Sequence, residues 1–388
     1  MSNRPSREFA IRTSVGFGGT FLPLAVQLAF LPVWLEATGF EPDAIGLLLG
    51  AALAARVVLV PVLVAWSDGF ATRRRAFVAF ATATALLSMP LLIESSFGIA
   101  FAVIAASVGG AAIIPVIDSL ALQGVQRHGL RFGRMRLWGS VAFVVATLAS
   151  GYAIERFGLA PVPLIVIGTL ALSLLAGLAL PAGGTRRIQT SDRSLAADFD
   201  AGLIVGIACG SLVVASHATF YAFASIHWAA LGFGSGAIGW LWTIGVLAEI
   251  VLFAAVGKRV RLSSTSLLIG GAVAGIVRWT TFSWDGGYGF YVVNSLLHAG
   301  TFAAAYLGTQ QLIAERVAAD RHGRAQALSQ VVAGTATAAL TVASGWLYAR
   351  YASGAFIAPA LLCGLALVPL CVVYPQSARS GGETIEPE

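Results

Sequence analysis

The chain has 388 residues, of which 57% are hydrophobic and 11% are charged, and its mean hydropathy is +0.83. Soluble domains carry about 25% charged residues, so water is not the main solvent of this chain. A net charge of +6 would suit a nucleic-acid-binding protein. The basic residues, however, lie in short tracts between long apolar runs and form no basic face. Composition therefore excludes a soluble nucleic-acid-binding protein and indicates an integral membrane protein.

The cysteines indicate no metal site and no disulfide framework, because Cys209, Cys363 and Cys371 all fall inside apolar runs. We expect no cofactor. The first apolar run, 13–34, is too long for the apolar part of a signal peptide. The sequence also lacks the G-x-x-x-x-G-K phosphate-binding loop, so ATP-driven transport by this chain alone is not expected.

A membrane-spanning helix needs about 20 mainly apolar residues, and the chain contains twelve such runs. In chain order they are 12–35, 44–66, 76–93, 98–124, 137–156, 162–181, 201–229, 236–257, 264–283, 288–312, 325–350 and 354–374. We therefore predict an all-α transmembrane fold of twelve helices.

Lys and Arg gather at every second connection between these runs. They occupy the N-terminal segment 4–12, the loops at 73–75, 127–136, 186–193, 258–261 and 316–324, and the tail at Arg379. Loops rich in Lys and Arg remain on the cytoplasmic side. Both termini are expected to be cytoplasmic, and we expect the protein to lie in a bacterial-type inner membrane and to function as a monomer.

The two halves of the chain resemble each other. The pattern from Gly39 to Leu59 recurs from Gly232 to Leu252, at an offset of 193 residues. Ala-Ser-Gly-Tyr at 149–152 recurs as Ala-Ser-Gly-Trp at 343–346, at nearly the same offset. The repeat predicts two six-helix bundles related by a pseudo-twofold axis, the architecture of the major facilitators. The predicted divisions are a first half at 1–181, a cytoplasmic linker at 182–200, a second half at 201–374 and a cytoplasmic tail at 375–388.

Ionisable side chains inside membrane spans are costly and mark cavities or partner groups. Six stand out: Arg56, Asp118, His217, Glu249, Arg278 and His298. The repeat aligns Arg56 with Glu249, which gives the two halves opposite charges at equivalent positions. This pair is expected either to flank a ligand or to clamp the halves together.

Three of these groups lie on successive spans of the second half: Glu249, Arg278 and His298. A buried carboxyl group and a histidine can both exchange protons near neutral pH. An arginine stays charged and can grip a carboxylate with two donors. We therefore expect a ladder of groups in which Glu249 and His298 can exchange protons and Arg278 can grip a carboxylate.

Further candidates for the substrate site follow from helical spacing. His217 and Tyr221 lie one turn apart, Asn294 precedes His298 by one turn, and Trp242 shares a stripe with Glu249. Simpler interpretations remain open, since Arg278 could snorkel to the outer surface and His217 could serve only as a contact between helices.

Charged residues near the cytoplasmic side have a structural interpretation. Asp68, before Arg73, Arg74 and Arg75, is expected to brace the turn between the second and third spans. Asp118 is expected to pair with Arg134 or Arg136.

Several strings resemble a known family. The loop from Asp68 to Arg75 loosely resembles the loop motif of the major facilitator superfamily, although Ala71 and Val64 replace its usual glycines. The string from Phe132 to Phe143 is more specific. Together with Ala248-Glu249, Val277-Arg278-Trp279 and the segment 298–302, it resembles the phenylpropionate permease family over essentially the whole chain.

That family is similar to lactose permease, a proton symporter with Glu, Arg and His on helices 8, 9 and 10. By position the resemblance implies these roles for Glu249, Arg278 and His298. One position departs from the pattern, because Thr301 stands where lactose permease has a second acid. Either Glu249 takes the proton itself or the coupling is built differently.

The leading hypothesis is proton-coupled import of a small aromatic carboxylic acid, such as 3-phenylpropionate, by alternating access. The alternative on the same fold is a proton-antiport exporter of lipophilic compounds. A membrane-embedded transferase is the third hypothesis. It is disfavoured, and an enzyme is not expected, because the intramembrane groups are spread over different helices and depths.

Overall fold

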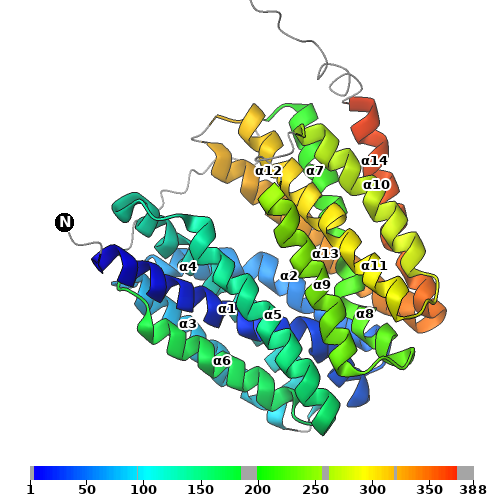
Figure 1. Ribbon diagram of the computed structural model, residues 1–388, viewed down its shortest axis with the longest axis horizontal. Coiled ribbons are helices and arrows are strands. Elements are labelled where there is room, and N and C mark those ends of the chain that lie inside the picture. The colour runs from blue at the N-terminus through cyan, green and yellow to red at the C-terminus, as the bar shows by residue number, and fades with distance from the viewer. Residues whose placement is uncertain (1–3, 94, 185–198, 256–261, 319–320, 374–388) are drawn as a thin grey trace, which may run out of the picture. The chain divides into compact units, whose positions relative to one another are not determined.

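The computed structural model describes residues 4–93, 95–184, 199–255, 262–318 and 321–373. Within these ranges the regular structure is entirely helical (Figure 1). In the first half the helices are α1 (Arg4–Ala37), α2 (Pro42–Ser67), α3 (Arg73–Leu87), the short η1 (Met89–Leu92), α4 (Ser96–His128), α5 (Phe132–Phe157) and α6 (Val162–Ala179).

The second half follows the same plan with more interruptions. Its helices are α7 (Ala201–Ala215), α8 (Ala218–Ala230), α9 (Ser235–Ala255), α10 (Ser264–Phe282), α11 (Tyr288–His298), η2 (Ala299–Ala303), α12 (Ala304–Arg316), α13 (His322–Tyr351), η4 (Ala352–Phe356) and α14 (Ile357–Val373).

Ten helical segments of the described chain are long and apolar enough to cross a membrane. One of them, His322–Val373, holds both α13 and α14, and so accounts for two spans. The run from α11 to α12 lies outside the ten, because η2 divides it into helices shorter than a span. Together these segments correspond to the twelve predicted spans.

Two predicted spans of the second half are interrupted well inside their length. The span at 201–229 breaks at Ser216 and His217, between α7 and α8. At this break side chains bond to main-chain carbonyl groups: Ser216 Oγ donates to Val213 O at 2.6 Å, and His217 Nδ1 lies 3.0 Å from Val214 O. The span at 288–312 contains the π-turn η2 directly after His298. Irregular backbone is tolerated at membrane depth where protein surrounds it.

Local sequence explains several helix ends. Thr72, Ser95, Asp200 and Ser263 cap α3, α4, α7 and α10 with side-chain oxygens that accept main-chain N–H bonds. α4 ends at Gly129, whose φ of +62° is the left-handed conformation that favours glycine.

The chain divides into two compact units. One unit comprises 1–190 and 221–243, and the other comprises 191–220 and 244–388, so the division passes through α8 and α9. In the first unit α1 packs on α4, α5 and α6, and α4 packs on α2 and α3. In the second, α10 packs on α12 and α14, and α7 packs on α12, α13 and α14. The boundaries expected for the two halves, 1–181 and 201–374, remain a prediction. The expected tail at 375–388 and most of the linker lie outside the described residues.

Within the first unit, the end of α5 packs closely on the start of α9. Gly236 N donates to Glu155 Oε2 at 2.7 Å, and Trp240 Nε1 donates to the hydroxyl of Tyr152 at 2.9 Å. A Cβ atom at Gly151 would lie 2.7 Å from the carbonyl oxygen of Ser235. The missing side chain therefore permits this approach of two helices.

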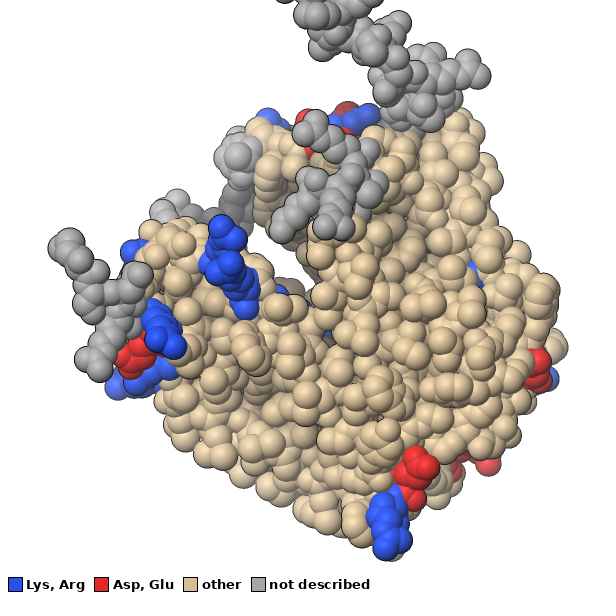
Figure 2. Space-filling view, viewed as in Figure 1, with Lys and Arg blue, Asp and Glu red and all other residues tan. Residues whose placement is uncertain are grey.

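Charged side chains are few on the face drawn in Figure 2, where broad areas carry none. Large apolar side chains are instead strongly exposed, among them Val62, Leu361 and Val372, with exposed fractions of 63%, 69% and 71%. Such an apolar surface suits contact with lipid chains.

Candidate functional site

Arg278 on α10 lies at the centre of a buried polar cluster in the second unit. Its side chain has an exposed fraction of 0%. Nη1 lies 3.0 Å from Nδ1 of His298 and donates to Thr301 Oγ1 at 3.1 Å. Nε donates to Asn294 Oδ1 at 3.4 Å. Arg278 therefore points into the protein, which contradicts the interpretation that it snorkels to the outer surface.

Two aromatic rings hold the Arg278 guanidinium. Its central carbon lies 4.6 Å from the centre of the Phe220 ring and 4.4 Å from that of Trp279. A cation over an aromatic face gains about 0.5–2 kcal/mol. Trp279 is itself buried, and its Nε1 donates to Ser216 Oγ at 2.9 Å. The charge therefore lies beside two aromatic rings as well as the polar groups of the cluster.

Asn294 on α11 orients Arg278. Its Nδ2 donates to the main-chain oxygen of Arg278 at 2.9 Å and to Thr281 Oγ1 at 3.1 Å. Its Oδ1 accepts from Arg278 Nε. One amide group thus fixes both the backbone and the side chain of the arginine, and this contact joins α10 to α11.

His298 connects the arginine to an acid. A guanidinium only donates hydrogen bonds, so Nδ1 of His298 accepts from Arg278 and the ring proton is on Nε2. That Nε2 lies 3.7 Å from Oε2 of Glu249 on α9. A hydrogen bond requires an approach to below about 3.5 Å, so a small movement is enough to join them. The Phe302 ring stacks on His298 at 5.5 Å between ring centres.

His217 enters the same cluster from the break between α7 and α8. It is completely buried, and its Nε2 lies 2.9 Å from Thr301 Oγ1. Its ring centre lies 5.2 Å from that of His298 and 5.1 Å from that of Trp279. The α7–α8 break and η2 therefore both contribute side chains to one site. Discontinuous helices and π-turns often mark functional sites in membrane proteins.

Tyr221 and Trp242 lie in the first unit. Their rings stack at 6.0 Å between centres, and Trp242 Nε1 donates to Ser225 Oγ at 2.8 Å. Arg56 on α2, also in this unit, has a half-buried side chain. Because Arg56 and Glu249 belong to different units, their expected juxtaposition remains a prediction.

Asp118 on α4 lies in the electrostatic field of Arg136 on α5, but its Oδ1 is buried with no hydrogen-bond partner among the described residues. The guanidinium of Arg136 lies 3.9 Å from the centre of the Phe21 ring. Arg134 is exposed. Of the two expected partners, Arg136 is therefore the one near Asp118.

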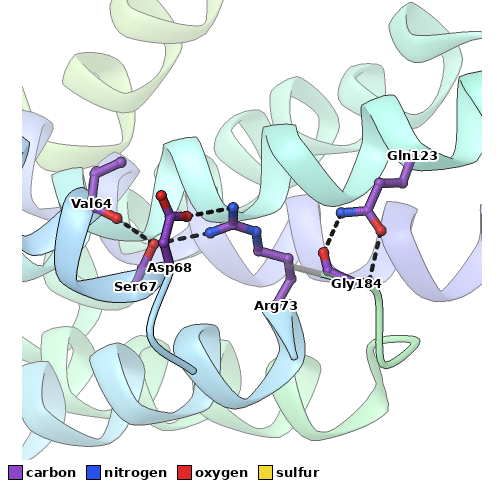
Figure 3. A network of polar contacts seen from close by, with 6 residues as sticks. All are labelled: Val64, Ser67, Asp68, Arg73, Gln123 and Gly184. Carbon is purple, nitrogen blue, oxygen red and sulfur yellow. Dashed lines mark hydrogen bonds and ion pairs between the residues drawn. The ribbon is translucent and has the colours of Figure 1, made fainter. Parts of the chain in front are cut away.

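The turn between α2 and α3 is closed by an ion pair (Figure 3). Arg73 Nη2 lies 2.6 Å from Asp68 Oδ1, and Arg73 Nη1 donates to Ser67 Oγ at 3.0 Å. The exposed fraction of the Arg73 side chain is 4%. Arg74 and Arg75 are exposed. Gln123 of α4 exchanges two hydrogen bonds with the main chain of Gly184, at 2.7 and 2.9 Å.

Sequence reasoning missed the position of Thr301 between His217 and Arg278 and the contacts of Arg278 with the rings of Phe220 and Trp279. In the sequence Thr301 stands out only as a departure from a family pattern, and Trp279 only as a neighbour of Arg278 in a family string. Helical spacing could have indicated Thr301, because it follows His298 by three residues and so lies on the same helix face.

Comparison with known proteins identifies matches along most of the chain. The model of the family described as MFS_1 like family matches residues 20–358. A probable 3-phenylpropionic acid transporter of Escherichia coli (strain K12) is 30% identical over 379 residues, covering 92% of this chain and 98% of that protein. The maltose permease of Geobacillus stearothermophilus is 26% identical over 373 residues, covering 93% and 86%.

Solved structures agree in fold. A mutant of the nucleoside transporter NupG has a TM-score of 0.81 at 14% identity, covering 94% of this chain and 100% of that one. A bacterial homolog to the human lysosomal transporter Spinster, in an inward-facing and unoccupied conformation, has a TM-score of 0.67 at 11% identity, covering 96% and 98%. These likenesses confirm the predicted all-α transmembrane fold of the major facilitator type.

Proposed function

Because the chain belongs to the MFS_1-like family of the major facilitator superfamily and is a secondary transporter of that kind, we propose that it imports a small aromatic carboxylic acid together with protons. 3-Phenylpropionate is the substrate we propose to test first, since the 30% identical relative is named for that acid. Alternating access moves one half of such a protein against the other around a fixed site.

The observation that carries this proposal is the surroundings of Arg278. A buried guanidinium between Phe220 and Trp279 offers a fixed positive charge beside aromatic surfaces. An aromatic carboxylate supplies the complementary pair of groups, a charged head for the fork of donors and a ring for apolar contact. Asn294 would keep the guanidinium oriented while the substrate arrives and leaves.

Proton coupling would use Glu249 and His298. In the described geometry Nε2–H of His298 faces the Glu249 carboxyl at 3.7 Å, and Nδ1 is held by the Arg278 guanidinium. A proton taken by Glu249 would remove the negative charge nearest to this histidine. A substrate carboxylate at Arg278 would then replace that charge, which links the two events by electrostatics.

Other roles complete the proposal. Tyr221 and Trp242 would supply aromatic surface for the substrate, Arg56 a second positive charge and His217 a polar contact. Asp68 with Arg73, Arg74 and Arg75, and Asp118 with Arg134 and Arg136, would serve the structure of the cytoplasmic side. The protein would lie in the inner membrane as a monomer, with both termini in the cytoplasm.

Uptake of labelled 3-phenylpropionate into proteoliposomes tests the proposal. We expect an inward proton gradient to drive accumulation above the external concentration, and a proton-conducting uncoupler to abolish it. Equilibration without accumulation would remove the proton coupling. Absence of uptake and of binding by folded protein would remove this substrate and leave the transporter fold unchanged.

A further inference from the structure

The hydroxyl group of Thr301 has one proton and three close neighbours. His217 Nε2 lies 2.9 Å from Oγ1, Arg278 Nη1 donates to it at 3.1 Å, and the main-chain oxygen of His298 lies 3.0 Å away. Thr301 and His217 both have exposed fractions of 0%. Because no water-exposed alternative exists for either side chain, these contacts determine where the hydroxyl proton points.

The chemistry of the neighbours leaves only two arrangements. Arg278 always donates, so it takes one lone pair of the Thr301 oxygen. His217 Nδ1 lies 3.0 Å from Val214 O, a carbonyl oxygen that only accepts, so Nδ1 carries a proton. When His217 is neutral, its Nε2 is therefore an acceptor and Thr301 must donate to it. When His217 is protonated, Nε2 donates to Thr301, and the hydroxyl proton turns to His298 O.

We propose that Thr301 is a positioning residue whose hydroxyl group transmits the protonation state of His217 to Arg278 and His298. In the protonated arrangement two cationic donors, His217 and Arg278, share one oxygen atom. Their repulsion weakens the hold of Thr301 on Arg278 and increases the attraction of the site for an anion. The role in transport rests on the proposed function, whereas the hydrogen-bond chain itself does not.

The ionisable groups around His217 come from several helices. Arg278 of α10 and His298 of α11 face it directly, Glu249 of α9 reaches the cluster through His298, and Cys363 of α14 contacts Ser216 and Trp279 beside it. The rings of His217 and His298 also touch, at 5.2 Å between centres. A test must therefore separate the hydroxyl link from this direct contact between rings.

Nitrogen-15 NMR of histidine-labelled, substrate-free protein in lipid nanodiscs can distinguish the link through the Thr301 hydroxyl group from the direct contact between the histidine rings. The reporter is Nδ1 of His298, which accepts from the same Arg278 nitrogen that donates to Thr301. Thr301→Val removes the hydroxyl group and keeps the shape of the side chain and the ring contact. Thr301→Ser keeps the hydroxyl group and is the matched control. His217→Gln keeps polarity and removes the titration.

We expect the His298 signal of the wild type and of Thr301→Ser to change over the pH range in which the His217 signal titrates. In Thr301→Val and in His217→Gln this response should be lost, while the His298 signal itself remains. A wild-type response in Thr301→Val would overturn the proposal, because the ring contact would then carry the link. A His298 signal that ignores the titration of His217 in the wild type would also overturn it.

Binding of 3-phenylpropionate gives a second, functional measurement. One proton linked to binding changes affinity by up to about tenfold per pH unit. We expect the affinity of Thr301→Val for 3-phenylpropionate to depend less on pH than the affinity of Thr301→Ser. If the NMR response follows the hydroxyl group but 3-phenylpropionate does not bind, the proposed substrate fails and the role of Thr301 stands. If 3-phenylpropionate binds with equal pH dependence in both variants, the role of Thr301 fails and the proposed substrate stands.

Discussion

The Nη1 atom of Arg278 lies 3.0 Å from the Nδ1 atom of His298, so the arginine determines which ring nitrogen of the histidine carries the proton. Since Arg278 only donates, His298 must present a lone pair at Nδ1 and its proton at Nε2. This places the mobile proton on the side of Glu249. A fixed charge thus orients a group that can exchange protons.

His217 and His298 should therefore be opposite tautomers when neutral. Val214 O requires the proton of His217 on Nδ1, and Arg278 requires that of His298 on Nε2. Nitrogen-15 chemical shifts distinguish the two forms, and replacing each histidine in turn assigns the signals. Finding both residues in the same tautomer would contradict the geometry of the cluster.

Arg278→Lys should weaken substrate binding although it keeps the positive charge. A lysine has one nitrogen and lacks the planar fork, so it cannot reach Asn294, His298 and Thr301 together. We expect the affinity for 3-phenylpropionate to fall at least about tenfold, or about 1.4 kcal/mol, by isothermal titration calorimetry. Arg350→Lys is the control, because Arg350 is exposed. Equal affinity in both variants would show that charge alone is enough.

The contact between α5 and α9 predicts an unusual effect of alanine. Alanine normally stabilises a helix relative to glycine by about 0.5–1 kcal/mol. At Gly151, however, a Cβ atom would lie 2.7 Å from the carbonyl oxygen of Ser235. We expect Gly151→Ala to cost about 1–3 kcal/mol, seen as a lower Tm in detergent.

Gly168→Ala is the matched control for this effect, because a Cβ atom at Gly168 meets nothing within 4 Å. It should keep or raise the Tm. If Gly151→Ala behaves in the same way as this control, the close approach of α5 to α9 is incorrect.

Hydropathy and charge were enough to predict the spans, because lipid imposes long apolar runs and leaves the basic residues in the loops. The break at Ser216 and His217 could not be predicted in this way. A hydropathy window averages over about 19 residues, whereas this break depends on two side chains that bond to main-chain carbonyl groups. The π-turn η2 could not be predicted from hydropathy for the same reason.

The candidate site was partly predictable. Glu249, Arg278 and His298 were expected on successive spans, because charge inside a membrane is conspicuous. The structure brings them into one cluster with Asn294 and His217. Thr301 could not be identified as a site residue from the sequence, since the hydroxyl group of a threonine in a membrane helix commonly bonds to the backbone of its own helix. Only the three-dimensional contacts distinguish this threonine from the others.

The turn between α2 and α3 should depend on Asp68. Asp68→Asn removes the charge that faces Arg73 Nη2 at 2.6 Å. Because Arg73 is buried, we expect a loss of about 1–3 kcal/mol, measured as a lower Tm. Glu8→Gln removes an exposed partner of Arg12 and should have little effect. Equal Tm values for the two variants would argue against a bracing role for Asp68.

Glu249→Gln in proteoliposomes tests the central claim most directly, because it removes the proposed proton carrier and keeps the size of the side chain. Two measurements are made on the same vesicles: accumulation of labelled 3-phenylpropionate driven by an inward proton gradient, and exchange of internal for external 3-phenylpropionate without a gradient. We expect that accumulation is abolished while exchange persists. Accumulation by Glu249→Gln at the level of the wild type would contradict it, and the coupling proton would then have to be carried elsewhere.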